Sequence, residues 1–159
     1  MTEIKGYVRY GSKARWFDLP VSSQQVAEKL KISEEAAESA GVTALDGDLK
    51  YGRYFVVSLA KANNIAEKIQ DIPAILLKNV SLIISTYFDD LDDFLENYDN
   101  LVILQGCSDE REVGNLLYQG RDFTDEEISQ YFDFERLARD DMQEFNGMFL
   151  DGAYIHQNQ

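Results

Sequence analysis

The strongest constraint on the fold of this chain is a long stretch without positive charge, which runs from Lys78 to Arg111. Its centre, residues 87–100, reads YFDDLDDFLENYDN and contains six acids and no base. Carboxylates are costly to bury without partners, so the fold must leave these groups in water. The apolar residues between them must meanwhile reach a core. A helix meets both demands, because it sorts the two kinds of side chain onto different faces.

On a helix over residues 88–98, the apolar side chains fall at i, i+3, i+7 and i+10 and form one core-facing stripe. The stripe consists of Phe88, Leu91, Leu95 and Tyr98. Asp89 is the expected N-cap. The acids then lie on the outer faces, where six like-charged pairs at i,i+3 or i,i+4 cost roughly 1–3 kcal/mol together. Their density, about one charge per 3 Å of helix, is close to one phosphate per about 3.4 Å of a DNA strand.

The charge of the whole chain is equally one-sided. Residues 1–83 hold 10 acids and 11 bases, whereas residues 84–159 hold 19 acids and 4 bases, so the second half carries the entire net charge of −14. Nucleic acid is a poor direct ligand for such a surface, and a basic or nucleic-acid-binding protein is the expected partner. The candidate partner-binding acids are Asp89, Asp90, Asp92, Asp93, Glu96, Asp99, Asp109, Glu110, Glu112, Asp122, Asp125, Glu126, Glu127, Asp133, Glu135, Asp140, Asp141 and Glu144.

The length and composition of the chain suit a few small cores. With 159 residues and 45% hydrophobic side chains, the chain has the material for one domain or several small subdomains. It contains no apolar run long enough to span a membrane and no leader-like start, and its single Cys107 excludes an internal disulfide. We therefore expect a cytoplasmic protein without a membrane partner.

The pattern along the chain predicts an α+β fold in three small subdomains. The N-terminal α+β subdomain, residues 1–59, has expected strands at 3–10, 14–19 and 53–59 and expected helices at 21–32 and 33–41. The central subdomain, residues 60–100, is expected to be a helical bundle in which Pro73 begins a long helix.

The C-terminal acidic α+β subdomain, residues 101–159, begins with a strand at 101–105 and a helix at 109–120. Thr124 and Glu127 match a capping box, which predicts a helix over about 125–131. A further helix at 133–145 and a hairpin at 147–156 complete the expected elements. Their expected positions and bounds follow from periodicity and turn residues alone.

Catalytic chemistry finds little support in the sequence. His156 is the only histidine and lies near the C-terminus, and Cys107 ends an apolar strand like a buried structural cysteine. No phosphate-binding glycine motif occurs. The acidic segment lacks the glycine and the ligand spacing of a calcium-binding EF-hand loop. We therefore expect no enzyme activity, no catalytic residues, no metal site and no cofactor.

A helix-turn-helix over residues 21–41 is also disfavoured as a DNA reader. The would-be recognition helix at 33–41 carries Glu34, Glu35 and Glu38 and no base. Such helices meet phosphates and base edges with arginine, lysine or amide side chains. We therefore expect no direct contact with nucleic acid there.

Several short motifs resemble the ArdA-type antirestriction proteins. The run YFDFERLARDDMQEFNGMFLDGAYI, residues 131–155, is similar to the closing segment of that family. RWFDLP at 15–20 resembles its tryptophan-to-proline segment, and CSDEREVGNLLYQG at 107–120 resembles its turn-and-helix section. Ala138 and Asp141 depart from the residues usual in that family, and residues 33–52 match it poorly.

The resemblance implies an elongated homodimer, with three small domains per chain, that imitates bent duplex DNA. Such a protein occupies the DNA-binding groove of type I restriction-modification enzymes, protects incoming mobile DNA and is not an enzyme. The acids listed above would then stand in for phosphates. The dimer contact implied by the resemblance involves Leu117, Tyr118 and Asp122. The alternative that the charge pattern leaves open is an acidic adaptor or inhibitor of another basic or nucleic-acid-binding protein.

Overall fold

The computed structural model describes residues 1–52, 55–118, 124, 126–127 and 133–158. The chain packs as two compact units, Met1–Glu96 and Asn97–Gln159. The described residues contain eight α-helices and two antiparallel sheets, which confirms the α+β class. The arrangement in three subdomains is not confirmed and stays a prediction. Among the described residues, no helix is both long and apolar enough to cross a membrane.

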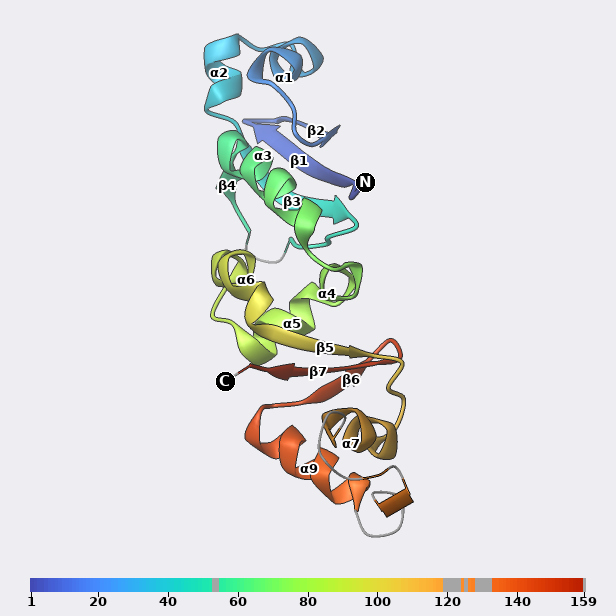
Figure 1. Ribbon diagram of the computed structural model, residues 1–159. Coiled ribbons are helices and arrows are strands. Elements are labelled where there is room, and N and C mark those ends of the chain that lie inside the picture. The colour runs from blue at the N-terminus through green and yellow to red at the C-terminus, as the bar shows by residue number, and fades with distance from the viewer. Residues whose placement is uncertain (53–54, 119–123, 125, 128–132, 159) are drawn as a thin grey trace. The chain divides into compact units, whose positions relative to one another are not determined.

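The N-terminal unit is built on a four-stranded sheet in the order β2-β1-β3-β4 (Figure 1). The strands are β1 (Ile4–Tyr10), β2 (Lys13–Asp18), β3 (Gly41–Gly47) and β4 (Val57–Ser58). Alternate residues of the central strand β1 are buried, among them Ile4 and Val8, and Val42 of β3 joins them in the core. The strands expected at 3–10 and 14–19 are therefore confirmed.

The strand assignment over residues 41–59 was only partly right. The sequence predicted no strand at Gly41–Gly47, where β3 lies, and of the strand expected at 53–59 only Val57–Ser58 is a strand among the described residues. Tyr51 also forms an isolated bridge with Leu45. Residues 53–54 lie outside the described part. The strand β4 ends early because the Ser58 hydroxyl accepts a hydrogen bond from the backbone N–H of Lys61 at 3.1 Å and so caps the next helix.

The helices of this unit begin where capping residues allow it. α1 (Ser23–Leu30) is capped by Ser22 through a reciprocal capping box with Gln25. α2 (Glu34–Glu38) is capped by Ser33, and α3 (Leu59–Lys68) is followed by the short 3₁₀ helix η1 (Ile69–Asp71). α3 packs against β1 and β3.

The long helix expected after Pro73 is broken into α4 (Ala74–Lys78) and α5 (Val80–Tyr87). Pro73 is the residue before the first turn rather than part of it. The break falls at Asn79, whose side-chain amide donates to the Ile75 carbonyl at 2.9 Å and competes with the backbone ladder. Both helices bury apolar side chains in the core, including Leu76 of α4 and Ile83 of α5.

The C-terminal unit has a three-stranded sheet in the order β5-β7-β6 (Figure 1). Its strands are β5 (Leu101–Gln105), β6 (Met148–Leu150) and β7 (Ala153–Gln157), and its helices are α7 (Glu110–Tyr118) and α9 (Phe134–Glu144). The expected strand at 101–105 and the hairpin at 147–156 are confirmed. Of the helix expected at 125–131, only residues 126 and 127 are described, and both are helical.

The core of this unit forms where α7 and α9 meet the sheet. Cys107, Val113, Ala138 and Tyr154 are fully buried there. Gly114 allows the close crossing of the two helices, because a Cβ atom at this position would lie 2.2 Å from the carbonyl oxygen of Phe134. The two helices therefore depend on a residue without a side chain at this crossing.

Replacing Gly114 with alanine should destabilise the C-terminal unit despite the higher helix propensity of alanine. The added methyl group meets backbone atoms of α9, so the helices must separate at a cost of roughly 1–3 kcal/mol in the free energy of unfolding. Urea denaturation followed by circular dichroism measures this loss. The matched control is Asn115→Ala at the neighbouring exposed position of α7. Equal stability of the two variants would contradict the close crossing.

Candidate functional site

The acidic segment forms α6 (Leu91–Asn97), followed by the 3₁₀ helix η2 (Tyr98–Asn100). Leu91, Phe94 and Leu95 are buried, so the predicted core-facing stripe exists, with Phe94 as an additional member. Phe88 precedes the helix in an extended conformation and packs its ring against Phe94 at a centroid distance of 5.6 Å. The helix therefore separates apolar from acidic side chains as the sequence predicts.

The N-cap of this helix was predicted wrongly. Asp90, rather than Asp89, precedes the first turn, and its carboxylate accepts a hydrogen bond from the Asp93 N–H at 2.8 Å. The Asp93 carboxylate in turn accepts from the Asp89 N–H at 3.0 Å. These two acids satisfy backbone donors that a helix start otherwise leaves unpaired.

This arrangement lowers the repulsion expected within the segment. Three of the six like-charged pairs involve residues that precede the helix, so they do not stack on a helical face. Asp92 and Asp93 occupy the first turn, where the positive end of the helix dipole offsets their charge. The cost of roughly 1–3 kcal/mol inferred from spacing is therefore an upper bound.

A base from another helix partly replaces the missing positive charge. Lys61 of α3 donates to the Asp92 carboxylate at 2.7 Å, although 31 positions separate the two residues. Both side chains are about half exposed, so the pair contributes at most about 1 kcal/mol to stability. The segment contains no basic residue of its own, but Lys61 from a distant part of the sequence lies beside it.

Acids also begin the helices of the C-terminal unit. Asp109 accepts from the Glu112 N–H at 2.8 Å, and Glu112 accepts from the backbone N–H of Ser108 at 2.8 Å and from its hydroxyl at 3.1 Å. Asp133 caps α9 by accepting from the Arg136 N–H at 3.0 Å. These carboxylates stabilise helix starts as well as carrying charge.

The capping box predicted at Thr124 is confirmed. Its hydroxyl accepts from the Glu127 N–H at 3.2 Å, and the Glu127 carboxylate accepts from the Thr124 N–H at 3.2 Å. Glu127 is therefore a further acid with a structural role.

Three more acids are held by partners within the C-terminal unit. The Arg139 guanidinium lies 3.0 Å from the Glu110 carboxylate and 3.7 Å from that of Glu135, and so links α7 with α9. Asp141 accepts a hydrogen bond of 2.5 Å from the hydroxyl of the fully buried Tyr154. Asp141 therefore satisfies the one polar atom of a core side chain.

The remaining described candidates form a group that we call the unbonded acids. They are Asp89, Glu96, Asp99, Glu126, Asp140 and Glu144. All six side chains are exposed, and within the described part of the chain none of them accepts a hydrogen bond or joins an ion pair. Asp122 and Asp125 lie outside the described residues. The unbonded acids are therefore the candidate carboxylates that make no stabilising interaction in the described fold.

The residues implied for a dimer contact are only partly described. Leu117 is half-buried and packs against the core of the C-terminal unit. Tyr118 ends α7, and its side chain lies outside the description, as does the whole of Asp122. Their role in a dimer stays a prediction.

His156 and Cys107, the two residues considered for catalysis, both pack within the C-terminal unit. His156 belongs to the strand β7, with its Nδ1 atom 2.8 Å from the Gln157 carbonyl oxygen, and its ring packs near Phe145 and Tyr154. Cys107 is fully buried, and this burial raises the pKa of its thiol. Among the described residues, no group of three or more histidine, cysteine or acidic side chains is placed to hold a metal ion.

The chain also matches a known protein family. A family model described as antirestriction protein (ArdA) matches residues 7–156, which is nearly the whole chain. The chain belongs to the ArdA antirestriction protein family. No curated protein sequence matches the chain significantly. The ArdA assignment identifies the chain as an antirestriction protein.

Sequence reasoning assigned a helix-capping role only to Asp89 and Glu127 among the acids of this ArdA-family chain, whereas the structure gives such a role to several more. The signal that was available is the position of an Asp or Ser before a helix and of an acid three residues later. Ser108, Asp109 and Glu112 fit that pattern. The pairing of Lys61 with Asp92 had no local signal, because it depends on how two distant helices pack.

Changing Asp109 and Asp133 to asparagine should leave the stability of the C-terminal unit nearly unchanged, whereas changing both to alanine should lower it. Asparagine caps helices about as well as aspartate, but alanine removes the acceptor at about 1 kcal/mol per site. Urea denaturation should therefore show a loss of about 2 kcal/mol for the alanine pair only. Equal losses in both pairs would mean that the charge, rather than the hydrogen bond, stabilises these helices.

Proposed function

We propose that the chain inhibits type I restriction-modification enzymes by occupying their DNA-binding groove as a mimic of duplex DNA. The observation that carries this proposal is the set of unbonded acids, which are exposed in both units and have no structural partner in the described fold. Membership of the ArdA family supplies the antirestriction context. A basic groove that normally holds phosphates would supply the positive charges that these carboxylates lack within the described fold.

The described acids support the proposal to different degrees. Asp90, Asp109 and Asp133 are needed at helix starts, so their presence has an explanation without a partner. Glu96 and Asp99 have no such explanation. Repulsion between like-charged neighbours on a helix destabilises the helix. A binding partner that neutralises them would offset this cost.

The proposed inhibitor acts by binding and needs no catalytic residue. We further propose that it acts as a homodimer through Leu117, Tyr118 and Asp122, and that it meets its target in the cytoplasm. The dimer proposal rests on the family resemblance and on the partial exposure of Leu117. Sedimentation equilibrium of the parent protein and of the Leu117→Asp variant tests the dimer proposal. A parent protein that is monomeric at all concentrations would contradict it.

Neutralising five unbonded acids should weaken binding to a type I methyltransferase about tenfold or more. The variant carries Asp89→Asn, Glu96→Gln, Asp99→Asn, Asp140→Asn and Glu144→Gln. Each exposed charge contributes about 0.2–1 kcal/mol in a complementary field, and about 1.4 kcal/mol corresponds to tenfold. Titration of labelled duplex DNA bound to the enzyme measures the displacement by each protein.

The matched control neutralises five exposed acids of the first half of the chain and reaches the same net charge of −9. It carries glutamine at Glu28, Glu34, Glu35, Glu38 and Glu67. The control should bind nearly as well as the parent if the position of the charge matters. Equal weakening of both variants would show that only the total charge matters.

The same titration separates the two functions that the charge pattern allows. Displacement of DNA, weakening steeply with added salt, supports the mimic. DNA that stays bound at a large excess of the parent protein contradicts it. The alternative is then an acidic inhibitor of a different basic or nucleic-acid-binding protein.

A further inference from the structure

Two bases of the described chain hold acids that belong to the candidate partner surface. Lys61 of α3 lies 2.7 Å from the Asp92 carboxylate of α6. Arg139 of α9 lies 3.0 Å from the Glu110 carboxylate of α7 and 3.7 Å from that of Glu135. The first pair belongs to the N-terminal unit and the second group to the C-terminal unit. Each unit therefore carries a positive side chain among its candidate acids.

The Lys61–Asp92 pair lies beside one of the unbonded acids. Asp92 is in the first turn of α6, and Glu96 follows it at i+4, so the two carboxylates are neighbours on the helix. The side chains of Lys61 and Asp92 keep 45% and 55% of their surface exposed, so a partner can reach both. The ammonium group of Lys61 therefore cancels one carboxylate of α6 and partly offsets the charge of the next.

Arg139 has a corresponding place in the C-terminal unit. Its guanidinium contacts Glu110 and Glu135, and its side chain is 56% exposed. Asp140 and Glu144, both unbonded acids, lie on the same helix, α9. One positive charge thus occupies two carboxylates of the α7–α9 pair and lowers the negative potential around the others.

The helices that carry these acids are held in place by other contacts. α6 buries Leu91 and Phe94 in the core, and α7 and α9 cross closely at Gly114. Exposed ion pairs contribute little to stability in comparison with the burial of such apolar side chains. We therefore expect the positions of the acidic helices not to depend on the two bases.

A basic partner must compete with these bases for the same carboxylates. Exposed ion pairs are weak, so a cation of the partner can replace the base of the chain itself. The displaced base stays attached nearby and repels the positive charges of the partner. Both effects lower the affinity of the acidic surface for a basic groove.

We propose that Lys61 and Arg139 act as internal counter-ions that lower the affinity of the acidic surface for the DNA-binding groove of the restriction enzyme. This role rests on the proposed function, because it concerns the strength of that same binding. If the two bases instead positioned the acidic helices for the partner, their removal would weaken binding. As internal counter-ions they have the opposite effect, and their removal strengthens binding.

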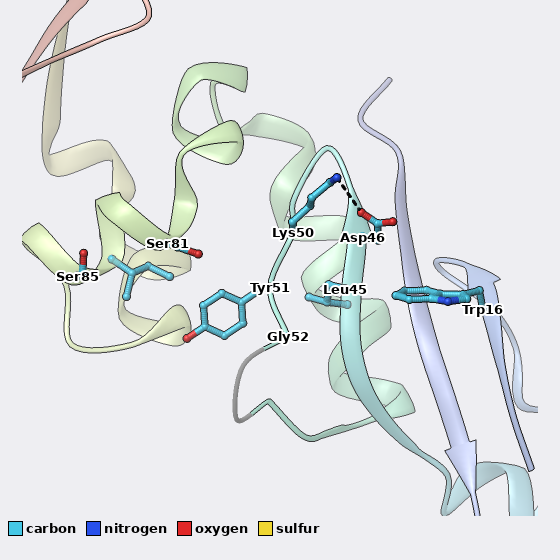
Figure 2. Close-up of a pocket in the computed structure, with 9 residues that line it drawn as sticks. Trp16, Leu45, Asp46, Lys50, Tyr51, Gly52, Ser81 and Ser85 are labelled. Carbon is cyan, nitrogen blue, oxygen red and sulfur yellow. Dashed lines mark ion pairs between the residues drawn. The ribbon is translucent and has the colours of Figure 1, made fainter. Parts of the chain in front are cut away.

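Another ion pair provides a control with the same chemistry outside the candidate surface. Lys50 lies 3.5 Å from the Asp46 carboxylate, and both side chains are exposed. The pair lies at the rim of a hollow of about 710 Å³ that Trp16 and Tyr51 also line (Figure 2). Removing Lys50 frees a carboxylate and changes the net charge as removing Lys61 does, but at a place where no partner contact is proposed.

Displacement of labelled duplex DNA from a type I methyltransferase by the full chain tests the sign of the effect. Lys61→Gln and Arg139→Gln should each lower the concentration for half displacement by about 1.5- to 5-fold, whereas Lys50→Gln should act like the parent. Combining the two changes should lower it by about 2- to 25-fold, because changes in separate units add. The gain should shrink as salt is added, and Lys61→Arg, which keeps the charge, should bind like the parent.

A variant with the net charge of the parent removes total charge as the explanation. Lys61→Gln with Asp92→Asn deletes one charge of each sign and keeps the net charge of −14. Because Lys61 cancels Asp92 in the parent, this variant should bind like the parent. Asp92→Asn alone leaves the lysine unpaired and should bind more weakly. Circular dichroism spectra check that each variant is folded.

The outcomes separate failure of the counter-ion role from failure of the proposed function. If the parent leaves DNA bound at a large excess, the proposed function fails and the counter-ion role falls with it. If the parent displaces DNA but Lys61→Gln and Arg139→Gln do so no better than Lys50→Gln, only the counter-ion role is overturned. Weaker displacement by the folded variants would assign the two bases a positioning role and overturn it as well. Stronger displacement by both, lost again in Lys61→Gln with Asp92→Asn, supports it.

Discussion

The hydrogen bonds that carboxylates accept from backbone N–H groups at helix starts are the interaction on which the acidic part of this structure depends. Asp90, Asp109 and Asp133 each precede a helix and each accept from the residue three positions on. The start of a helix has unpaired N–H donors and a partial positive charge. A carboxylate there accepts hydrogen bonds from the donors and is attracted by the positive charge. Acids that look like pure excess in the sequence are thus part of what positions α6, α7 and α9.

This use of acids changes how the charge of the chain is understood. Some of its negative charge stabilises the fold, some is held by Lys61 and Arg139, and the unbonded acids remain available to a partner. The solvent face of α9 carries Arg136 and Arg139 between Glu135 and Asp140, so the acidic surface is interrupted there. Electrostatic imitation of DNA by this chain therefore rests on fewer carboxylates than the net charge suggests.

The N-terminal unit presents a different kind of surface. Its sheet buries one face under helices and leaves Trp16, Tyr7 and Arg9 on the other, where an aromatic pair lies beside positive charge. Exposure of a large apolar ring costs free energy unless a ligand covers it. The N-terminal unit therefore carries this mixed aromatic and basic face in addition to the acids of the α6 segment.

Sequence by itself determined much of the local structure. Hydrophobic spacing located most strands and helices, and the Thr124 capping box followed from residue type, because it depends on neighbours a few positions away. The family resemblance carried by short motifs is confirmed by the match over residues 7–156.

Tertiary structure alone decided the rest. The strand β3 exists because β1 pairs along its length, with a register shift that places an extra residue in β3 between Val42 and Leu45 and disturbs the alternation a single strand would show. Lys61 reaches Asp92, and Asp141 reaches Tyr154, only after distant elements have packed. Local patterns report what a residue prefers, whereas the role of a carboxylate as cap, ion-pair partner or exposed charge depends on neighbours that only the folded chain brings to it.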